Sequence, residues 1–127
     1  MELVAVVIAL ALMEFVAFGM LVGRARGTYG VKAPAMSGHE VFDRYFRVHY
    51  NTMELLVVFV PSIWLFGLYI DPRWGAGIGA IYLVGRIVYF RDYITDPAGR
   101  GKGFGMSMLP VLVLLIGALL GAGRNLI

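Results

Sequence analysis

Four apolar runs, each close to the length of a membrane span, constrain this sequence more than any other feature. They cover residues 3–23, 55–70, 74–90 and 104–122 of a chain of 127 residues. A helix needs roughly 20 residues to cross a bilayer, and backbone polar groups in lipid must be satisfied within their own segment. We therefore expect an all-α integral membrane protein, a four-transmembrane-helix bundle that forms one domain over residues 1–127.

The composition excludes several other classes. The chain is 60% apolar and 15% charged, whereas soluble domains are about half apolar and a quarter charged. It has no cysteine, which excludes a disulfide scaffold and a cysteine zinc site, so any thiol chemistry must use a thiol that a ligand brings. The basic residues flank the apolar runs and form no soluble surface, so we expect no nucleic-acid partner.

Local signals place the helix boundaries. Ser37, three residues before Glu40, predicts a capped start for the second helix near Glu40. Asp71-Pro72 and Asp96-Pro97 end the second and third helices, because proline restricts the residue before it and cannot continue a helix. The first run lacks a basic start and carries Glu14 centrally, so we interpret it as a retained span and not as a signal peptide.

Charge placement orients the bundle. The basic residues that share one predicted side are Arg24, Arg26, Lys32, Arg44, Arg47, Arg86, Arg91, Arg100 and Lys102. The opposite side has only Arg73 and Arg124. The positive-inside rule makes the basic side cytoplasmic, with both termini on the other side.

Two polar stripes follow helical spacing. The stripe of the second helix is Arg44, Arg47, Asn51 and Glu54, and that of the third is Tyr82, Arg86, Tyr89 and Tyr93. A lone charge at the bilayer centre costs at least about 2.5–3.5 kcal/mol, so the two stripes should face each other. One hypothesis is that Glu54 and Arg86 pair and lock two helices. The other is that the excess of basic groups holds a small, multiply charged anion beside an apolar helix surface.

The same residues carry a family resemblance. Residues 42–54, FDRYFRVHYNTME, resemble the helix-two motif of the membrane-associated eicosanoid and glutathione metabolism (MAPEG) family. Residues 86–93, RIVYFRDY, resemble the family's helix-three motif, and residues 29–34, YGVKAP, resemble a loop common in its bacterial members. Four spans, chain length and charge placement agree with the family over essentially the whole chain.

The resemblance implies a homotrimer in a bacterial inner membrane, with glutathione bound between subunits near the cytoplasmic face and no metal. By position, the glutathione-binding residues are Arg26, Arg47, His49, Asn51, Glu54, Arg86, Tyr89 and Tyr93. His49 would contact the glutathione bound to the adjacent subunit. Arg24 is the alternative to Arg26. Arg100 matches the arginine proposed to activate the thiol, and Lys102 is its alternative. Leu55 stands where some members have a tyrosine, so one hydroxyl contact is missing.

The implied activity is glutathione-dependent: conjugation of hydrophobic electrophiles arriving from the bilayer, reduction of lipid hydroperoxides, or both. Two other classes stay open. One is a non-enzymatic lipid-binding relative, which would not bind glutathione. The other is a small proton-coupled multidrug exporter using Glu14, although the basic loop between the first two spans is longer than such exporters have.

Overall fold

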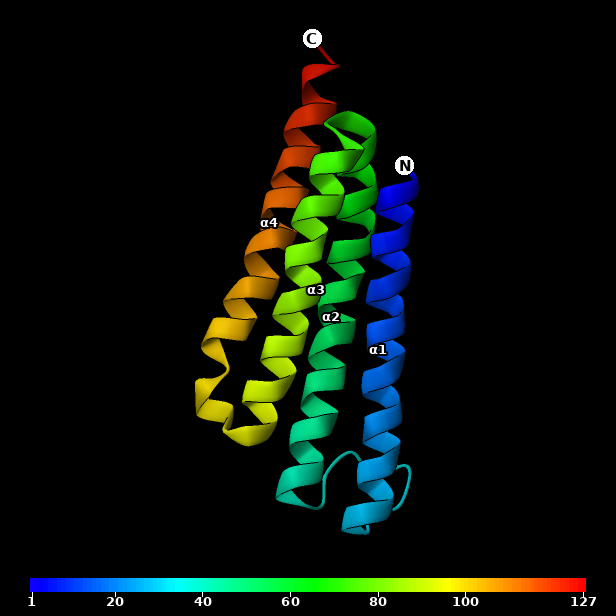
Figure 1. Cartoon of the computed structure of the whole chain (residues 1–127), viewed down its shortest axis with the longest axis vertical. Helices are drawn as coiled ribbons and strands as arrows, with labels where there is room; N and C mark the ends of the chain where they lie inside the picture. Colours follow the sequence, from blue (N-terminus) through cyan, green and yellow to red (C-terminus); the bar gives the residue numbers. More distant parts are fainter.

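Four long helices form an antiparallel bundle in the computed structural model, which describes residues 1–127 (Figure 1). The helices are α1 (Glu2–Tyr29), α2 (Glu40–Tyr69), α3 (Pro72–Thr95) and α4 (Gly101–Arg124), and a 3₁₀ turn, η1 (Pro97–Gly99), precedes α4. Both termini lie at the same end of the bundle, the upper end in Figure 1. This confirms the all-α bundle; that both termini lie on one side of a membrane stays a prediction.

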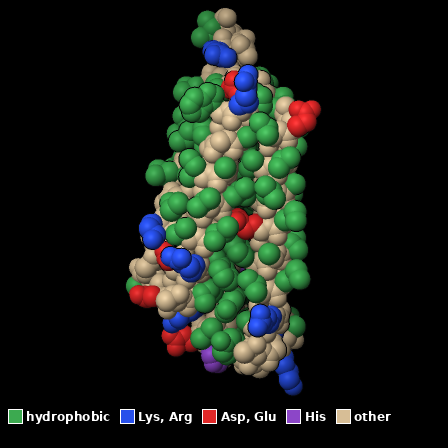
Figure 2. All heavy atoms as spheres, viewed as in Figure 1, with side chains coloured by type: hydrophobic (Ala, Val, Ile, Leu, Met, Phe, Trp, Pro, Cys, Tyr) green, Lys and Arg blue, Asp and Glu red, His purple; other side chains and the backbone are tan.

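Length and apolarity identify three helices able to cross a membrane: α1, α2, and α4 together with η1. The fourth, α3, has 24 residues, which is span length, but its tyrosines, glycines and charged residues make it less apolar; its crossing stays a prediction. Many large apolar side chains point outward, among them Met20, Val57 and Leu119, each at least 70% exposed. Figure 2 shows apolar side chains covering the middle of one face, with most charged groups toward the two ends. This is the surface of a bundle that faces lipid.

The helix starts follow local sequence, with one correction. Helix α2 ends at Tyr69, just before Asp71-Pro72, as predicted, and Asp71 also caps α3 by accepting a hydrogen bond from the Arg73 N–H at 2.7 Å. The cap of α2 is His39, whose Nδ1 accepts from the Val41 N–H at 3.1 Å. The predicted Ser37 cap is wrong because Ser37 lies two residues before the cap position.

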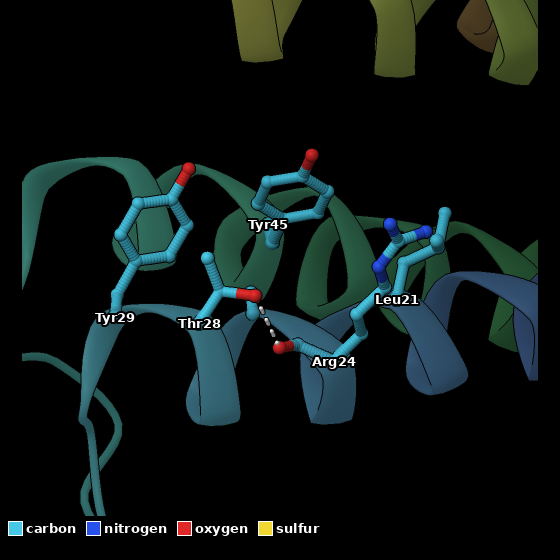
Figure 3. A pocket seen from close by; sticks show the side chains of 6 residues that line it. Leu21, Arg24, Thr28, Tyr29 and Tyr45 are labelled. Atoms are coloured by element: carbon cyan, nitrogen blue, oxygen red, sulfur yellow. Dashed lines mark hydrogen bonds between the residues drawn. The ribbon is translucent and has the colours of Figure 1, made fainter.

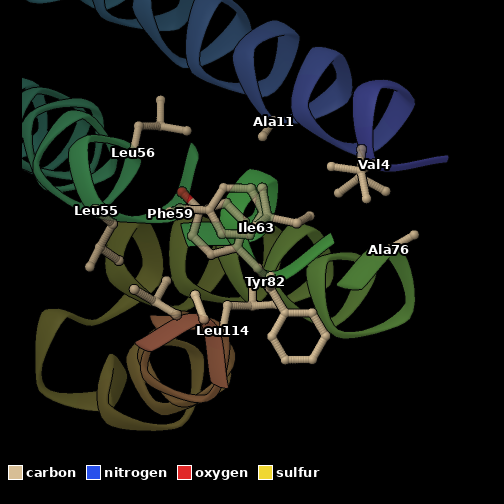
Figure 4. Packing of buried hydrophobic residues seen from close by; sticks show 13 residues of the cluster. Val4, Ala11, Leu55, Leu56, Phe59, Ile63, Ala76, Tyr82 and Leu114 are labelled. Atoms are coloured by element: carbon tan, nitrogen blue, oxygen red, sulfur yellow. The ribbon is translucent and has the colours of Figure 1, made fainter. Parts of the chain in front are cut away.

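The main core draws buried residues from all four helices. Val4 of α1, Phe59 of α2, Tyr82 of α3 and Leu114 of α4 belong to it (Figure 4). The Phe59 and Tyr82 rings stack with centroids 3.9 Å apart. This cluster fixes how α3 is rotated against its neighbours, and so which side of α3 faces inward.

Glycines bring α3 and α4 into close contact toward the basic end of the bundle. A Cβ atom at Gly85 would lie 2.6 Å from the Met106 carbonyl carbon, and one at Gly103 would overlap the backbone of Tyr89. Only glycine allows two helix backbones to approach this closely. The contact sets Tyr89 directly against the first turns of α4.

Candidate functional site

A solvent-open pocket of about 650 Å³ lies where α2, α3 and the start of α4 meet. The residues that line it are Arg47, Asn51, Tyr89, Tyr93, Ala98, Arg100, Gly101 and Phe104. Five of these are expected site residues: Arg47, Asn51, Tyr89, Tyr93 and Arg100. The structure therefore brings half of the residues of the two polar stripes, together with Arg100, to one cavity.

Arg86 lies behind the pocket and is fully buried. Its Nε donates to Ser107 Oγ at 2.8 Å, and its Nη1 donates to Asn51 Oδ1 at 2.8 Å and Thr52 Oγ1 at 3.2 Å. The guanidinium carbon lies 4.3 Å from the centroid of the Tyr89 ring, a cation–π distance. Arg86 thus ties together α2, α3 and α4, and it holds Asn51 and Tyr89 in place at the pocket wall.

Thr52 and Ser107 are site-supporting residues that sequence reasoning missed. Each hydroxyl donates to the carbonyl four residues earlier, Val48 or Gly103, at 2.8 Å. Each therefore presents an oxygen lone pair to the Arg86 guanidinium. The available signal was the one hydroxyl residue of the fourth apolar run, Ser107, near the expected depth of Arg86.

Glu54 does not pair with Arg86. Its side chain is exposed on the outside of the bundle, and the ion pairs of the structure involve other carboxylates. The first hypothesis for the stripes, a Glu54–Arg86 lock, is therefore wrong. Glu54 is rotated away from α3 because Thr52, two residues earlier, occupies the inward face of α2.

The two cations of the pocket face no carboxylate. Neither Arg47 nor Arg100 takes part in an ion pair, and Arg100 donates only to the Pro97 carbonyl at 2.8 Å. Lys102, the alternative to Arg100, lies outside this lining, with its Nζ 3.9 Å from Asp92 Oδ2. The structure thus leaves positive charge at the pocket on Arg47 and Arg100.

Arg44 belongs to the bundle's structure and not to the pocket lining. It pairs with Glu40 at 2.9 Å and donates to the Ile94 carbonyl at 2.9 Å. That carbonyl belongs to the last turn of α3, where the helix dipole and unpaired carbonyls attract a cation. The excess of positive charge at the pocket is therefore smaller than the sequence indicated.

Two expected site residues from this end of the molecule lie outside the pocket. Arg26 donates to the Ala35 carbonyl at 2.6 Å and lies over the Phe42 ring. His49 stacks on Phe15 of α1 with ring centroids 4.3 Å apart. Neither side chain lines the cavity that Arg47 and Arg100 line.

Arg24, the alternative to Arg26, lines a separate pocket of about 230 Å³ between the ends of α1 and α2 (Figure 3). The Tyr29 and Tyr45 side chains also line this pocket, and the Thr28 hydroxyl donates back to the Arg24 carbonyl at 3.1 Å. Neither candidate arginine of α1 therefore lines the pocket of Arg47 and Arg100.

The pocket is suited to an anionic organic ligand. Two guanidinium groups can bind carboxylates, and the Asn51 amide nitrogen and two phenol groups supply further hydrogen bonds. The structure contains no cluster of histidine, aspartate and glutamate side chains that could hold a metal ion. Fold and pocket together define a helical membrane protein with a basic, tyrosine-lined site at one end.

Comparison with known proteins gives the family. The MAPEG family model matches residues 3–120, and the chain belongs to this family. An uncharacterized protein of the cyanobacterium Synechocystis is 45% identical over 116 residues, which is 91% of this chain and 85% of that protein. Human microsomal glutathione S-transferase 2 is 35% identical over 80% of this chain and 70% of its own length. Rat leukotriene C4 synthase is 31% identical over 82% of this chain and 69% of its own length.

Proposed function

We propose that this protein is a glutathione transferase that conjugates hydrophobic electrophiles drawn from the membrane. The observation that carries the proposal is the pocket in which Arg47 and Arg100, free of carboxylate partners, meet Asn51, Tyr89 and Tyr93. Relatives named as microsomal glutathione S-transferase and leukotriene C4 synthase support glutathione as the ligand. By the positive-inside rule the pocket opens toward the cytoplasm.

Glutathione fits the charges of this site. It carries two carboxylates, one ammonium group and one thiol. Arg47 supplies a cation for a carboxylate and Arg100 one for the thiolate, and the Asn51 amide, whose oxygen accepts from Arg86, is left to donate to the peptide. The ammonium group needs an acceptor, which the pocket lining does not provide as a carboxylate.

We propose that the remaining contacts come from a second copy of the chain in a homotrimer. Glu54 is an exposed carboxylate on a membrane-spanning helix, and an unpaired charge there is costly unless another subunit covers it. Arg26 and His49 lie outside the pocket of their own subunit. A neighbouring subunit would bring them to the ligand and place Glu54 within reach of its ammonium group.

The reaction is a nucleophilic substitution or addition by sulfur. Arg100 stabilises the thiolate, which forms from the thiol by loss of its proton to solvent, and the sulfur electron pair forms a bond to the electrophilic carbon. That carbon releases its leaving group with the bonding pair, or an epoxide oxygen takes the pair and is protonated. The protein supplies position and charge, and the ligand supplies the nucleophile.

The first test is glutathione binding to the detergent-solubilised protein by calorimetry, with the thiolate followed by its ultraviolet absorbance. We expect saturable binding at up to millimolar concentration and an absorbance increase at neutral pH. Arg47→Ala should weaken binding, whereas Arg73→Ala, which removes a cation at the other end of the bundle, should not. A folded protein without affinity for glutathione would instead fit the lipid-binding relative and contradict this proposal.

A further inference from the structure

Glu14 of α1 is a half-buried acidic group for which the proposed reaction has no use. It lies within a membrane-spanning helix, and its Oε1 is buried and makes no hydrogen bond. Ionisable residues at this depth are rare and usually have a partner or a function. Membership of the MAPEG family removes the support for the exporter hypothesis, so another role is needed.

The register between α1 and α3 identifies the partner. A Cβ atom at Gly79 would lie 2.7 Å from Val7 Cγ1. Further along, the rings of Phe18 and Phe90 stack with centroids 5.0 Å apart. In both pairs the α3 residue is numbered 72 above the α1 residue (79 − 7 and 90 − 18). The two helices therefore run side by side in one register over this stretch.

Glu14 falls level with Arg86 in this register. Glu14 follows Val7 by seven residues, and Arg86 follows Gly79 by the same number. Seven residues are about two helical turns, so both side chains lie on the helix faces that already meet at Val7 and Gly79. The two side chains are not in direct contact, since no ion pair joins them.

Three buried side-chain polar atoms of the structure make no hydrogen bond: Glu14 Oε1, Tyr82 Oη and Arg86 Nη2. Tyr82 precedes Arg86 by one turn on α3, and its ring lies 6.0 Å from the guanidinium carbon. The set comprises one acceptor and two donors. A water molecule can donate to one group while accepting from two others, which is the complement of this set.

We propose that one water molecule joins Glu14 of α1 to Tyr82 and Arg86 of α3, and that Glu14 is the counter-ion that positions Arg86. Arg86 in turn holds Asn51 through its 2.8 Å hydrogen bond. Through Arg86 and Asn51, Glu14 is thus a positioning residue for the pocket. This positioning role rests on the proposed function. The cluster of Glu14, Tyr82, Arg86 and the water is a property of the bundle and does not depend on glutathione.

The cluster is tested by a double-mutant cycle on thermal unfolding in detergent. Glu14→Leu should lower the Tm by about 5 °C, because it leaves the Arg86 charge without its counter-ion. In an Arg86→Leu background the same change should lower it little or not at all. Glu14→Gln, which can still accept a hydrogen bond from the water, should lower the Tm less than Glu14→Leu does. Equal falls in both backgrounds would mean that Glu14 and Arg86 are not coupled, and would overturn the proposal.

The positioning role is tested by glutathione binding. Glu14→Leu should raise the glutathione Kd about tenfold and the KM with it, with kcat per folded enzyme little changed, and Glu14→Gln should recover most of the affinity. Glu2→Leu, which removes an exposed carboxylate from the same helix, is the matched control and should bind like the parent. An unchanged Kd in folded Glu14→Leu would contradict the positioning role. If the parent itself does not bind glutathione, the proposed function fails. The unfolding cycle then still tests whether Glu14 and Arg86 are coupled.

Discussion

At the scale of single residues, Arg86 shows how a buried cation is made tolerable in an apolar bundle. Its neighbours are the neutral oxygens of Asn51, Thr52 and Ser107 and the face of Tyr89. Charge-assisted hydrogen bonds of this kind contribute about 1.5–3 kcal/mol each. We therefore expect Arg86 to build the pocket wall; direct contact between Arg86 and glutathione, implied by the family resemblance, stays a prediction.

Ser107→Ala should destabilise the protein by about 1.5–3 kcal/mol, because Arg86 Nε loses its only acceptor in a buried site. Chemical unfolding in detergent measures the change. Ser62→Ala is the control, since Ser62 is also buried but makes no hydrogen bond to Arg86. Equal losses in the two variants would mean that the Ser107–Arg86 bond contributes nothing specific.

Arg100→Ser should leave glutathione binding within about threefold of the parent and reduce the thiolate at neutral pH about tenfold. The reason is that a thiol with a pKa near 8.5 is mostly protonated at pH 7 unless a cation favours its ionised form, and one pKa unit is a factor of ten. Thiolate absorbance and conjugation of a model aryl halide measure the effect. A variant that conjugates at the parent rate would show that Arg100 does not activate the thiol.

At the scale of helices, the site depends on how closely α3 and α4 approach. The contact through Gly85 and Gly103 sets Tyr89 against α4 and brings Ser107 within reach of Arg86. A wider spacing would break the Arg86–Ser107 bond and open the pocket between Tyr89 and Phe104. Small residues at this crossing are therefore part of the site, although they touch no ligand.

Gly103→Ala should destabilise the bundle by about 1–3 kcal/mol and weaken glutathione binding, because its Cβ would overlap the Tyr89 backbone. Gly105→Ala is the matched control two residues further along α4. A Cβ there meets no atom within 4 Å, so that change should be neutral or slightly stabilising, since alanine favours helix over glycine. Thermal unfolding and calorimetry compare the two. Loss of function in both would point to a need for flexible glycines and not to close packing.

At the scale of the whole molecule, a single chain does not gather all the proposed glutathione-binding residues in one pocket. The pocket gathers Arg47, Asn51 and Arg100, while Arg26 and His49 face elsewhere. In a cyclic assembly of identical subunits, each contact would join the pocket side of one chain to the side of the next chain that carries Arg26 and His49. Every site would then combine residues of two chains. This is the arrangement that the proposed homotrimer requires.

Mixing defective subunits tests the shared site. Arg26→Ala and Arg47→Ala subunits should each lack strong glutathione binding when expressed alone. Expressed together, they should recover roughly a quarter of the sites, because a random mixture places two intact residues at that fraction of contacts. Titration of binding sites in the purified mixture gives the number. No recovery would mean that both arginines serve the same chain or that subunits do not share sites.

The fold class, the helix ends near Asp71 and Asp96 and the two polar stripes could be predicted from the sequence, because span length, capping and helical periodicity are local properties of the chain. The packed bundle was needed to show that Arg86 bonds to Thr52 and Ser107 and not to Glu54, that Arg100 and not Lys102 lines the pocket, and that Glu14 is level with Arg86. Those outcomes depend on the rotation and register of one helix against another. Packing of the core and contact at glycines set both, and a pattern within a single helix contains no information about them.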